Sequence, residues 1–254
     1  MMEIRHNQGF TLIEFMVALT ISLLSLLAVS ELYLNSRQSA RLQQMQNVLT
    51  EEGRFAISML QRTVAQAGFR PVTAAMPVSA MTANSDRSLS VMFTQDGNQM
   101  RDCAGNAAVG NQTLTIATVN SALRCTPAVG NAVDWIAAPD ASGQGVELVD
   151  FRLSYGVDTG PATEPSLGCG DDLGNGNLRG DCVVDVYQVP AVGSALQRNI
   201  RSVRACLVLR TNMTDPSVLK SGAVIDCAGA AIANSQNDRR LYRLLRTTIQ
   251  LKNR

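Results

Sequence analysis

The amino-acid sequence predicts an α+β protein, in which one long N-terminal helix packs on an antiparallel β-sheet of a globular domain. Three observations lead to this fold class. A single long apolar stretch runs from Phe10 to Leu34. A more polar segment then keeps apolar residues at helical spacing, and short β-like runs separated by turn residues follow Gly68. A helix followed by strands is typical of an α+β architecture.

The apolar stretch is long enough to cross a membrane. As a helix it would extend about 38 Å, whereas the hydrocarbon core of a bilayer is about 30 Å thick. Its only charges are Glu14 and Glu31, and Phe15 to Tyr33 contains neither Gly nor Pro, so we expect one continuous transmembrane helix. A secretory signal carries its small-residue cleavage site after the apolar core, whereas here Gly9 precedes it. On hydropathy alone, an uncleaved single-pass anchor would explain this stretch.

Residues 35–67 predict an amphipathic continuation of the same helix. Apolar residues recur mostly at spacings of three and four: Met45, Val48, Leu49, Ala56, Met59, Leu60, Val64 and Ala67. Gly68 and Pro71 are typical helix-ending residues. From Met45 onward we expect this stripe to pack on the protein's own sheet. For Phe10 to Leu34 we favour packing against neighbouring subunits.

Residues 68–254 predict a β-rich globular domain. The candidate strands are Ser88–Thr94, Thr113–Val119, Ala132–Ala137, Val146–Tyr155, Cys182–Val189, Ile200–Thr211 and Leu241–Leu251. Between two of them, residues 168–182 are rich in glycine and aspartate and predict a loop. Asp171, Asn175 and Gly176 fit three positions of a calcium loop, but Leu173 and Cys182 stand where ligands are needed. We therefore expect a solvated loop without bound calcium.

The cysteines indicate disulfides in an oxidising compartment, here the periplasm. Their number is even and all lie beyond the apolar stretch: Cys103, Cys125, Cys169, Cys182, Cys206 and Cys227. Six cysteines allow about fifteen pairings, and the sequence does not choose among them; Cys169–Cys182 is the most local candidate. A zinc site is a poor alternative, because there is no C-x-x-C pair and the one histidine is His6.

The sequence offers no convincing catalytic site, and we expect neither an enzyme nor a cofactor. His6 is the only histidine, so the commonest general base is missing from the rest of the chain. Ser217 and Lys220 match the S-x-x-K pattern of penicillin-binding enzymes, but no K-T-G follows them. Two fixed positions in four residues arise often by chance.

The C-terminus is basic: Arg239, Arg240, Arg243, Arg246, Lys252 and Arg254 crowd the last sixteen residues without an acid. A patch that binds nucleic-acid phosphates would explain this charge. We favour a final strand whose arginines lie on a solvated face or protect a sheet edge, since Leu241, Leu245 and Ile249 give that strand a buried side. Only Tyr242 could stack on a base. We expect nucleic acid to be bound weakly, without sequence preference.

Gly9, Phe10 and Glu14, in the order Gly-Phe-Thr-Leu-Ile-Glu, resemble the class III signal of type IV pilins and type II secretion pseudopilins. This resemblance implies that residues 1–9 are a leader peptide. A prepilin peptidase would cut between Gly9 and Phe10 and methylate the new amine, and Glu14 would guide the subunit into a filament. Three segments of the C-terminal half, Val146–Asp158, Val203–Arg210 and Arg246–Arg254, are similar to PilW-type minor pilins.

The resemblance implies a minor pilin that joins other minor pilins and the major pilin in the priming complex at the pilus tip, with roles in twitching motility and adhesion. Before assembly, such a protein is a single-pass inner-membrane protein with a periplasmic domain. A J-type minor pseudopilin of a type II secretion system is the alternative, because it shares the same signal. A membrane-anchored binding domain or enzyme unrelated to filaments is the third hypothesis.

Overall fold

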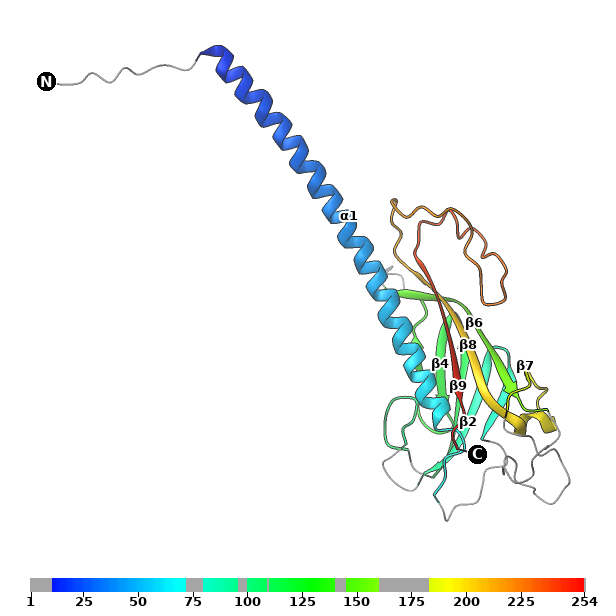
Figure 1. Ribbon diagram of the computed structural model, residues 1–254. Helices are drawn as coiled ribbons and strands as arrows, with labels where there is room; N and C mark the ends of the chain where they lie inside the picture. Colours follow the sequence, from blue (N-terminus) through cyan, green and yellow to red (C-terminus); the bar gives the residue numbers. More distant parts are fainter. Residues whose placement is uncertain are drawn as a thin grey trace. The chain divides into compact units, whose positions relative to one another are not determined.

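The structure is a computed structural model that describes residues 11–71, 80–95, 100–108, 110–139, 145–159 and 183–253. It divides into two compact units, residues 1–44 and residues 45–254, which are described separately below. The helix α1 (Leu12–Ala65) supplies residues to both units. All strands belong to the second unit (Figure 1).

The helix α1 ends two residues earlier than the apolar pattern predicts, and a turn carries the chain to Gly68. Gly68 has a φ of +72°, the left-handed conformation that commonly closes a helix and that glycine adopts without steric cost. Its N–H donates to the carbonyl oxygen of Met92 at 2.8 Å. The side-chain amide of Asn253 donates to the carbonyl oxygen of Ala65 at 3.1 Å. The C-terminal segment therefore caps the end of α1.

The first sheet is a five-stranded antiparallel meander in the order β1-β2-β3-β4-β5. Its strands are β1 (Met81–Ser85), β2 (Ser88–Gln95), β3 (Gly110–Val119), β4 (Ala122–Pro127) and β5 (Val133–Ile136). Asn120 and Ser121 join β3 to β4 with φ values of 49° and 63°, as a two-residue hairpin turn requires. The sequence pattern predicted β2, β3 and β5 but neither β1 nor β4.

The second sheet has four antiparallel strands in the order β7-β6-β8-β9. They are β6 (Val146–Val157), β7 (Val186–Gln188), β8 (Ile200–Thr211) and β9 (Tyr242–Gln250). The expected strand Cys182–Val189 is only three residues long here, and Cys182 lies outside the described residues. The strand β8 has the predicted bounds, with Val203, Ala205, Leu207 and Leu209 buried on one face.

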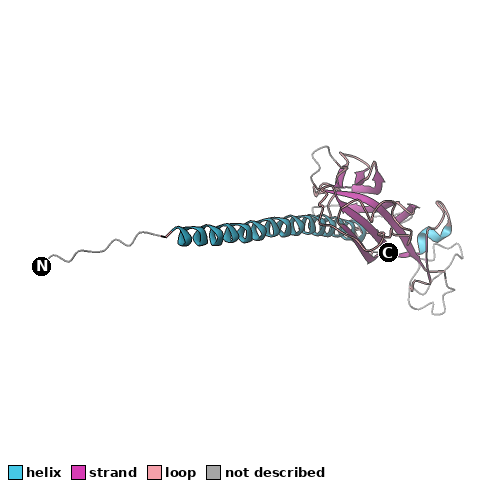
Figure 2. Ribbon diagram, turned by 90° about the horizontal axis from the view of Figure 1, so that it is seen from above, coloured by secondary structure: helices cyan, strands magenta, loops and turns pink. Residues whose placement is uncertain are grey.

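One hydrophobic core joins the C-terminal half of α1 to both sheets. Figure 2 shows the strands, coloured magenta, beside the C-terminal end of α1. The helix lies close to the sheet at Gly53, where an added Cβ would overlap with Leu245 and lie 3.3 Å from Cδ1 of Leu209. This packing confirms that the apolar stripe from Met45 onward faces the protein's own sheet.

The turn between β1 and β2 holds the first sheet against β6 of the second. The buried hydroxyl of Tyr155 donates to the carbonyl oxygens of Ser85 and Ser88, at 3.0 Å each. Arg152 and Asp86 form an ion pair across the same contact, and Arg87 reaches Asp150 at 3.3 Å. Burial of Tyr155, together with the nearby charge of Asp86, raises the pKa of its phenol above the ordinary value.

The outer edge of β1 is occupied by a side chain from the 3-10 helix η2 (Ala195–Asn199). The N–H of Ala83 donates to Oε1 of Gln197 at 2.7 Å, and Nε2 of Gln197 donates back to the carbonyl oxygen of Ala83 at 3.0 Å. The same Nε2 also donates to the carbonyl oxygens of Pro190 and Ala191. The amide of Gln197 thus forms the pair of hydrogen bonds that a neighbouring strand would form.

Two disulfides lie in the described chain, Cys103–Cys125 and Cys206–Cys227. They are among the fifteen pairings that the sequence left open, and they confirm the expectation of disulfide bonds. Cys169 and Cys182, the most local candidate pair, lie outside the described residues.

Candidate functional site

The helix α1 is long and apolar enough to cross a membrane, and the apolar part is its N-terminal part. Its large apolar side chains are exposed, from Leu12 at 77% to Leu34 at 65%. Its hydroxyl groups bond within the helix: Thr20, Ser25 and Ser30 donate to backbone carbonyl oxygens three or four residues earlier. These bonds satisfy groups that would otherwise be unpaired in lipid. Between Glu14 and Glu31 the segment therefore presents a largely apolar surface.

Glu14 and Thr11 form a reciprocal cap at the start of α1. The backbone N–H and the hydroxyl of Thr11 donate to Oε2 of Glu14 at 2.9 and 3.0 Å. The N–H of Glu14 in turn lies 3.3 Å from the hydroxyl oxygen of Thr11, which accepts it. This is the capping box, in which the side chains at both ends of the first turn bond each other's backbone N–H groups.

The capping box fixes the carboxylate of Glu14 beside the N-terminal end of the helix, where the helix dipole favours a negative charge. Both bonds from Thr11 end on Oε2. No other described residue donates to Oε1, so this oxygen can accept a hydrogen bond from another molecule. The arrangement therefore offers one carboxylate oxygen of Glu14 to a hydrogen-bond donor from outside the described chain.

Of the three N-terminal residues predicted to act together, the structure describes only Glu14. Gly9 and Phe10 lie outside the described residues. Thr11 was not predicted as a functional residue, although its sequence signal is present. Thr11-Leu-Ile-Glu14 has the spacing of a capping box, with a hydroxyl residue three positions before the acid.

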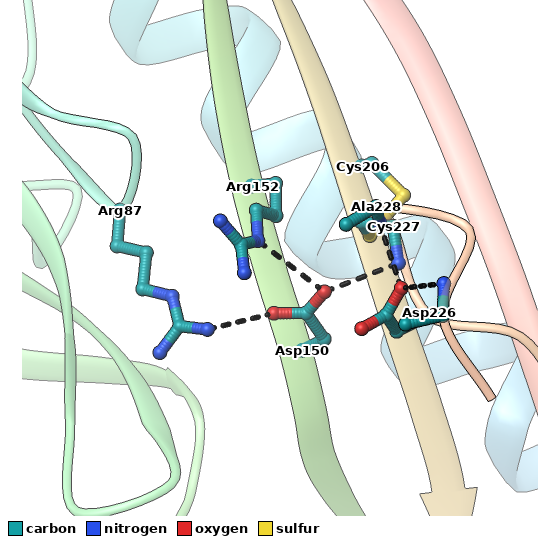
Figure 3. The surroundings of a disulfide bond; sticks show 8 residues. Arg87, Asp150, Arg152, Cys206, Asp226, Cys227 and Ala228 are labelled. Carbon is teal, nitrogen blue, oxygen red and sulfur yellow. Dashed lines mark hydrogen bonds and ion pairs between the residues drawn. A yellow bond between two sulfur atoms is a disulfide. The ribbon is translucent and has the colours of Figure 1, made fainter. Parts of the chain in front are cut away.

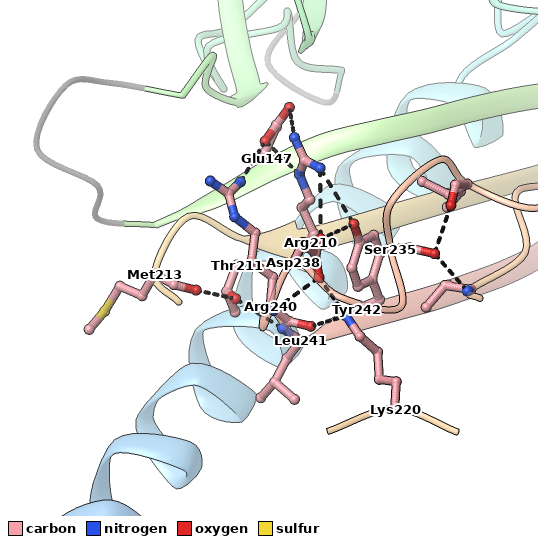
Figure 4. A network of polar contacts seen from close by, with 12 residues as sticks. Glu147, Arg210, Thr211, Met213, Lys220, Ser235, Asp238, Arg240, Leu241 and Tyr242 are labelled. Carbon is pink, nitrogen blue, oxygen red and sulfur yellow. Dashed lines mark hydrogen bonds and ion pairs between the residues drawn. The ribbon is translucent and has the colours of Figure 1, made fainter. Parts of the chain in front are cut away.

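The S-x-x-K segment is part of a structural network on the second sheet. Ser217 donates to Asp215. Lys220 donates to Oδ1 of Asp238 at 2.6 Å and to the carbonyl oxygen of Arg240 at 2.8 Å (Figure 4). No hydrogen bond joins Ser217 to Lys220 in this part of the chain. The two residues lack the contact that a serine nucleophile and its lysine base require.

Asp238 lies at the centre of this network. Burial favours the neutral acid, but hydrogen bonds from Lys220, Tyr242 and the N–H of Arg240 outweigh it and hold the pKa of Asp238 below its usual range. Arg210 donates to Tyr242 and forms two hydrogen bonds with Glu147, which raise the pKa of the guanidinium. The network fixes the long connection between β8 and β9 to the sheet.

Several of the C-terminal basic residues are engaged in this framework. Arg240 reaches Glu147 at 3.3 Å, and Arg243 donates to the hydroxyl of Thr50 on α1 at 2.7 Å. Arg246 is exposed on β9, and Ile249 on the same strand is buried. Arg254 lies outside the described residues. These contacts favour the interpretation of a final strand with structural arginines over that of a phosphate-binding patch.

No group of three or more metal-ligating side chains occurs within the described ranges. The loop that was compared with a calcium site, residues 168–182, lies outside them.

The fold and the exposed N-terminal helix define a pilin-like α+β protein with a membrane-length apolar helix. Comparison with known families agrees: residues 108–253 match the model of type IV pilus-assembly protein W, and residues 4–30 match the prokaryotic N-terminal methylation motif. The chain therefore belongs to the PilW family of type IV pilus-assembly proteins.

Among solved structures, the chain is similar to a type IV-like pilin from Thermus thermophilus, with 16% identity and a TM-score of 0.44. The match covers 81% of this chain and 97% of that pilin. No match was found among curated proteins.

Proposed function

We propose that this protein is a minor pilin of the type IV pilus, incorporated into the priming complex that initiates filament assembly and stays at the tip. The observation that carries the proposal is the self-capped Glu14 at the start of an exposed apolar helix, in a chain of the PilW family. The family match to a pilus-assembly protein favours this role over that of a J-type pseudopilin. The role is structural and needs neither a catalytic residue nor a cofactor.

The N-terminal methylation motif supports processing by a prepilin peptidase, which we place between Gly9 and Phe10. The cut would create an amine one residue before the Thr11–Glu14 cap. An ionised carboxylate costs about 2.5–3.5 kcal/mol at the bilayer centre. Glu14 lies at the start of the helix, where the two hydrogen bonds from Thr11 would lower the cost of placing its charge in the membrane. In the filament, we expect Oε1 of Glu14 to accept a hydrogen bond from the N-terminal amine of a neighbouring subunit.

The proposed partners are the other minor pilins, the major pilin and the prepilin peptidase. Before assembly, the apolar part of α1 would anchor the protein in the inner membrane, with residues 68–254 in the periplasm. Two disulfides in the second unit suit that oxidising compartment. After assembly the protein would be extracellular, at the pilus tip.

The test separates the charge of Glu14 from its capping role. Glu14→Gln keeps an oxygen that accepts the N–H of Thr11, but removes the charge; Glu14→Ala removes both. We expect both variants to insert into the membrane and both to be strongly depleted from sheared pili, measured by quantitative mass spectrometry of pilus and membrane fractions.

Wild-type incorporation of Glu14→Gln would show that the charge is not needed and would contradict the proposed pairing with an amine. Proteins that co-purify with the wild type then distinguish the two filament systems. Recovery of pseudopilins in place of pilins would favour the type II secretion alternative.

A further inference from the structure

Two segments, Met100–Ala108 and Val224–Ile232, share a short sequence motif although they are linked to strands of different sheets. Both contain Asp-Cys-Ala-Gly, at residues 102–105 and 226–229. Each cysteine of these segments forms a disulfide with a strand, Cys103 with Cys125 on β4 and Cys227 with Cys206 on β8. The sequence separations are 22 and 21 residues, but the segment precedes its strand in one case and follows it in the other.

The backbones of the two segments form the same hairpin. The N–H of Asp102 donates to the carbonyl oxygen of Asn106 at 3.0 Å, and that of Asp226 donates to Ala230 at 2.8 Å. Three further relations recur at equivalent positions: the glycine N–H donates to the aspartate carbonyl, an outer bond joins residues eight apart, and an isolated β-bridge flanks the turn. Gly105 and Gly229 have φ values of +84° and +87°.

The aspartate side chain plays the same part in both hairpins. Oδ1 of Asp102 accepts the N–H groups of Ala104 and Asn106 at 2.9 and 2.8 Å. Oδ1 of Asp226 accepts those of Ala228 and Ala230 at 2.9 and 2.8 Å. Local bonds from an aspartate to N–H groups two and four residues later stabilise a turn without any tertiary contact. The turn can therefore form in a chain that is not yet folded.

Each hairpin is also held by hydrogen bonds to its own part of the fold. The N–H of Arg101 donates to Oε1 of Gln66 at 2.8 Å, at the end of α1. The N–H of Cys227 donates to Oδ2 of Asp150 on β6 at 3.1 Å, and Figure 3 shows this bond next to the Cys206–Cys227 disulfide. Asp150 is also paired with Arg87 of the opposite sheet. Because Gln66 and Asp150 lie in different parts of the fold, these bonds hold each hairpin near a different strand.

We propose that the two hairpins are copies of one disulfide-directing turn. The aspartate folds the turn before oxidation and presents the next residue's thiol to a single strand cysteine. The native pairs then form in preference to the other pairings of six cysteines. In each oxidation, two thiols lose two protons and two electrons, and a disulfide oxidant such as oxidised glutathione is reduced to two thiols.

The test follows oxidative refolding of the full-length chain in detergent with a glutathione redox buffer. Free thiols are trapped at intervals, and the disulfides are mapped by peptide mass spectrometry. Asp226→Ala should slow formation of Cys206–Cys227 roughly tenfold, because two bonds to a charged acceptor are lost, and should leave the rate of Cys103–Cys125 unchanged. Asp102→Ala should do the reverse, so each variant is the control for the other.

Asparagine keeps the Oδ1 acceptor, so Asp102→Asn and Asp226→Asn should oxidise close to the wild-type rates. If both disulfides slow equally in either alanine variant, the effect is general destabilisation and the proposal is wrong. It is also wrong if the asparagine variants are as slow as the alanine variants, or if the alanine variants pair their cysteines at the wild-type rate.

A second pair of variants tests the turn when the aspartate is intact. Gly229 and Gly222 lie in the same connection, and a Cβ at either would meet no atom within 4 Å, but only Gly229 has a positive φ. Gly229→Ala should therefore slow the Cys206–Cys227 bond, and Gly222→Ala should not. Equal rates for these two variants would overturn the proposal independently of the aspartate data.

Discussion

Replacing Gly68 with alanine should destabilise the globular unit by about 2–4 kcal/mol. A residue with a Cβ in the left-handed conformation at φ +72° costs about 1–2 kcal/mol. The new Cβ would also overlap with the carbonyl oxygen of Asn253 and lie 2.9 Å from the Cβ of Ala80. The C-terminal segment would have to move, and this would weaken the 3.1 Å bond from Asn253 to Ala65, worth about 1 kcal/mol.

Gly105→Ala is the matched control, because Gly105 has a φ of +84° and a Cβ there would meet no atom within 4 Å. It should carry only the backbone cost of about 1–2 kcal/mol. Urea unfolding of the full-length protein in detergent can be followed by the fluorescence of Trp135, the one tryptophan, which is 2% exposed. Deleting residues 252–254 removes the contact with Asn253. In the shortened chain, the two glycine variants should therefore lose similar amounts of unfolding free energy. The packing argument is refuted if Gly68→Ala costs no more than Gly105→Ala in the intact chain.

Three further predictions concern processing, pH and nucleic acid. Gly9→Val should leave the full-length chain in the membrane, because a branched side chain obstructs the peptidase; intact mass analysis showing the mature mass would contradict this. Because the folded-state pKa of Asp238 is lowered, its stabilising effect should be complete above its unfolded pKa of about 4 and lost as pH falls through the folded value. The unfolding free energies of wild type and Asp238→Asn should therefore converge as the pH falls below the unfolded pKa of Asp238, and a constant difference would exclude this mechanism. Binding of DNA to the purified protein should be weak and abolished at physiological salt, and salt-resistant binding lost in Arg246→Ala would show that β9 is a functional surface.

The fold class could be predicted from the sequence because its two strongest signals are long. The helix has an uninterrupted apolar stretch followed by a stripe at helical spacing, and β8 has apolar residues at alternate positions from Val203 to Leu209. The strands β1 and β4 were missed because their patterns are weak. Met81-Thr-Ala-Asn-Ser85 is short and contains a poor strand former, and Ala122–Pro127 ends in a proline and follows the turn Asn120-Ser121, which lacks the glycine of the strongest hairpin signals.

The candidate site was predictable only in part. Glu14 stands out because a carboxylate in an apolar stretch is costly, whereas Thr11 is an ordinary helix-start residue until its bonds to Glu14 are seen. The native disulfide pairs depend on which strand each hairpin reaches, and this is decided by contacts distant in sequence, such as that between Cys227 and Asp150. The network around Lys220 was not predictable for the same reason.

The side-chain amide of Gln197 also limits how this protein can aggregate. An open sheet edge can pair with a strand from another molecule, and such pairing leads to aggregation. At Ala83 the N–H and the carbonyl oxygen on the β1 edge already bond to Gln197. An incoming strand would have to displace this glutamine, which is only 7% exposed. The first sheet is thereby protected at that position from pairing edge to edge with a strand of another molecule.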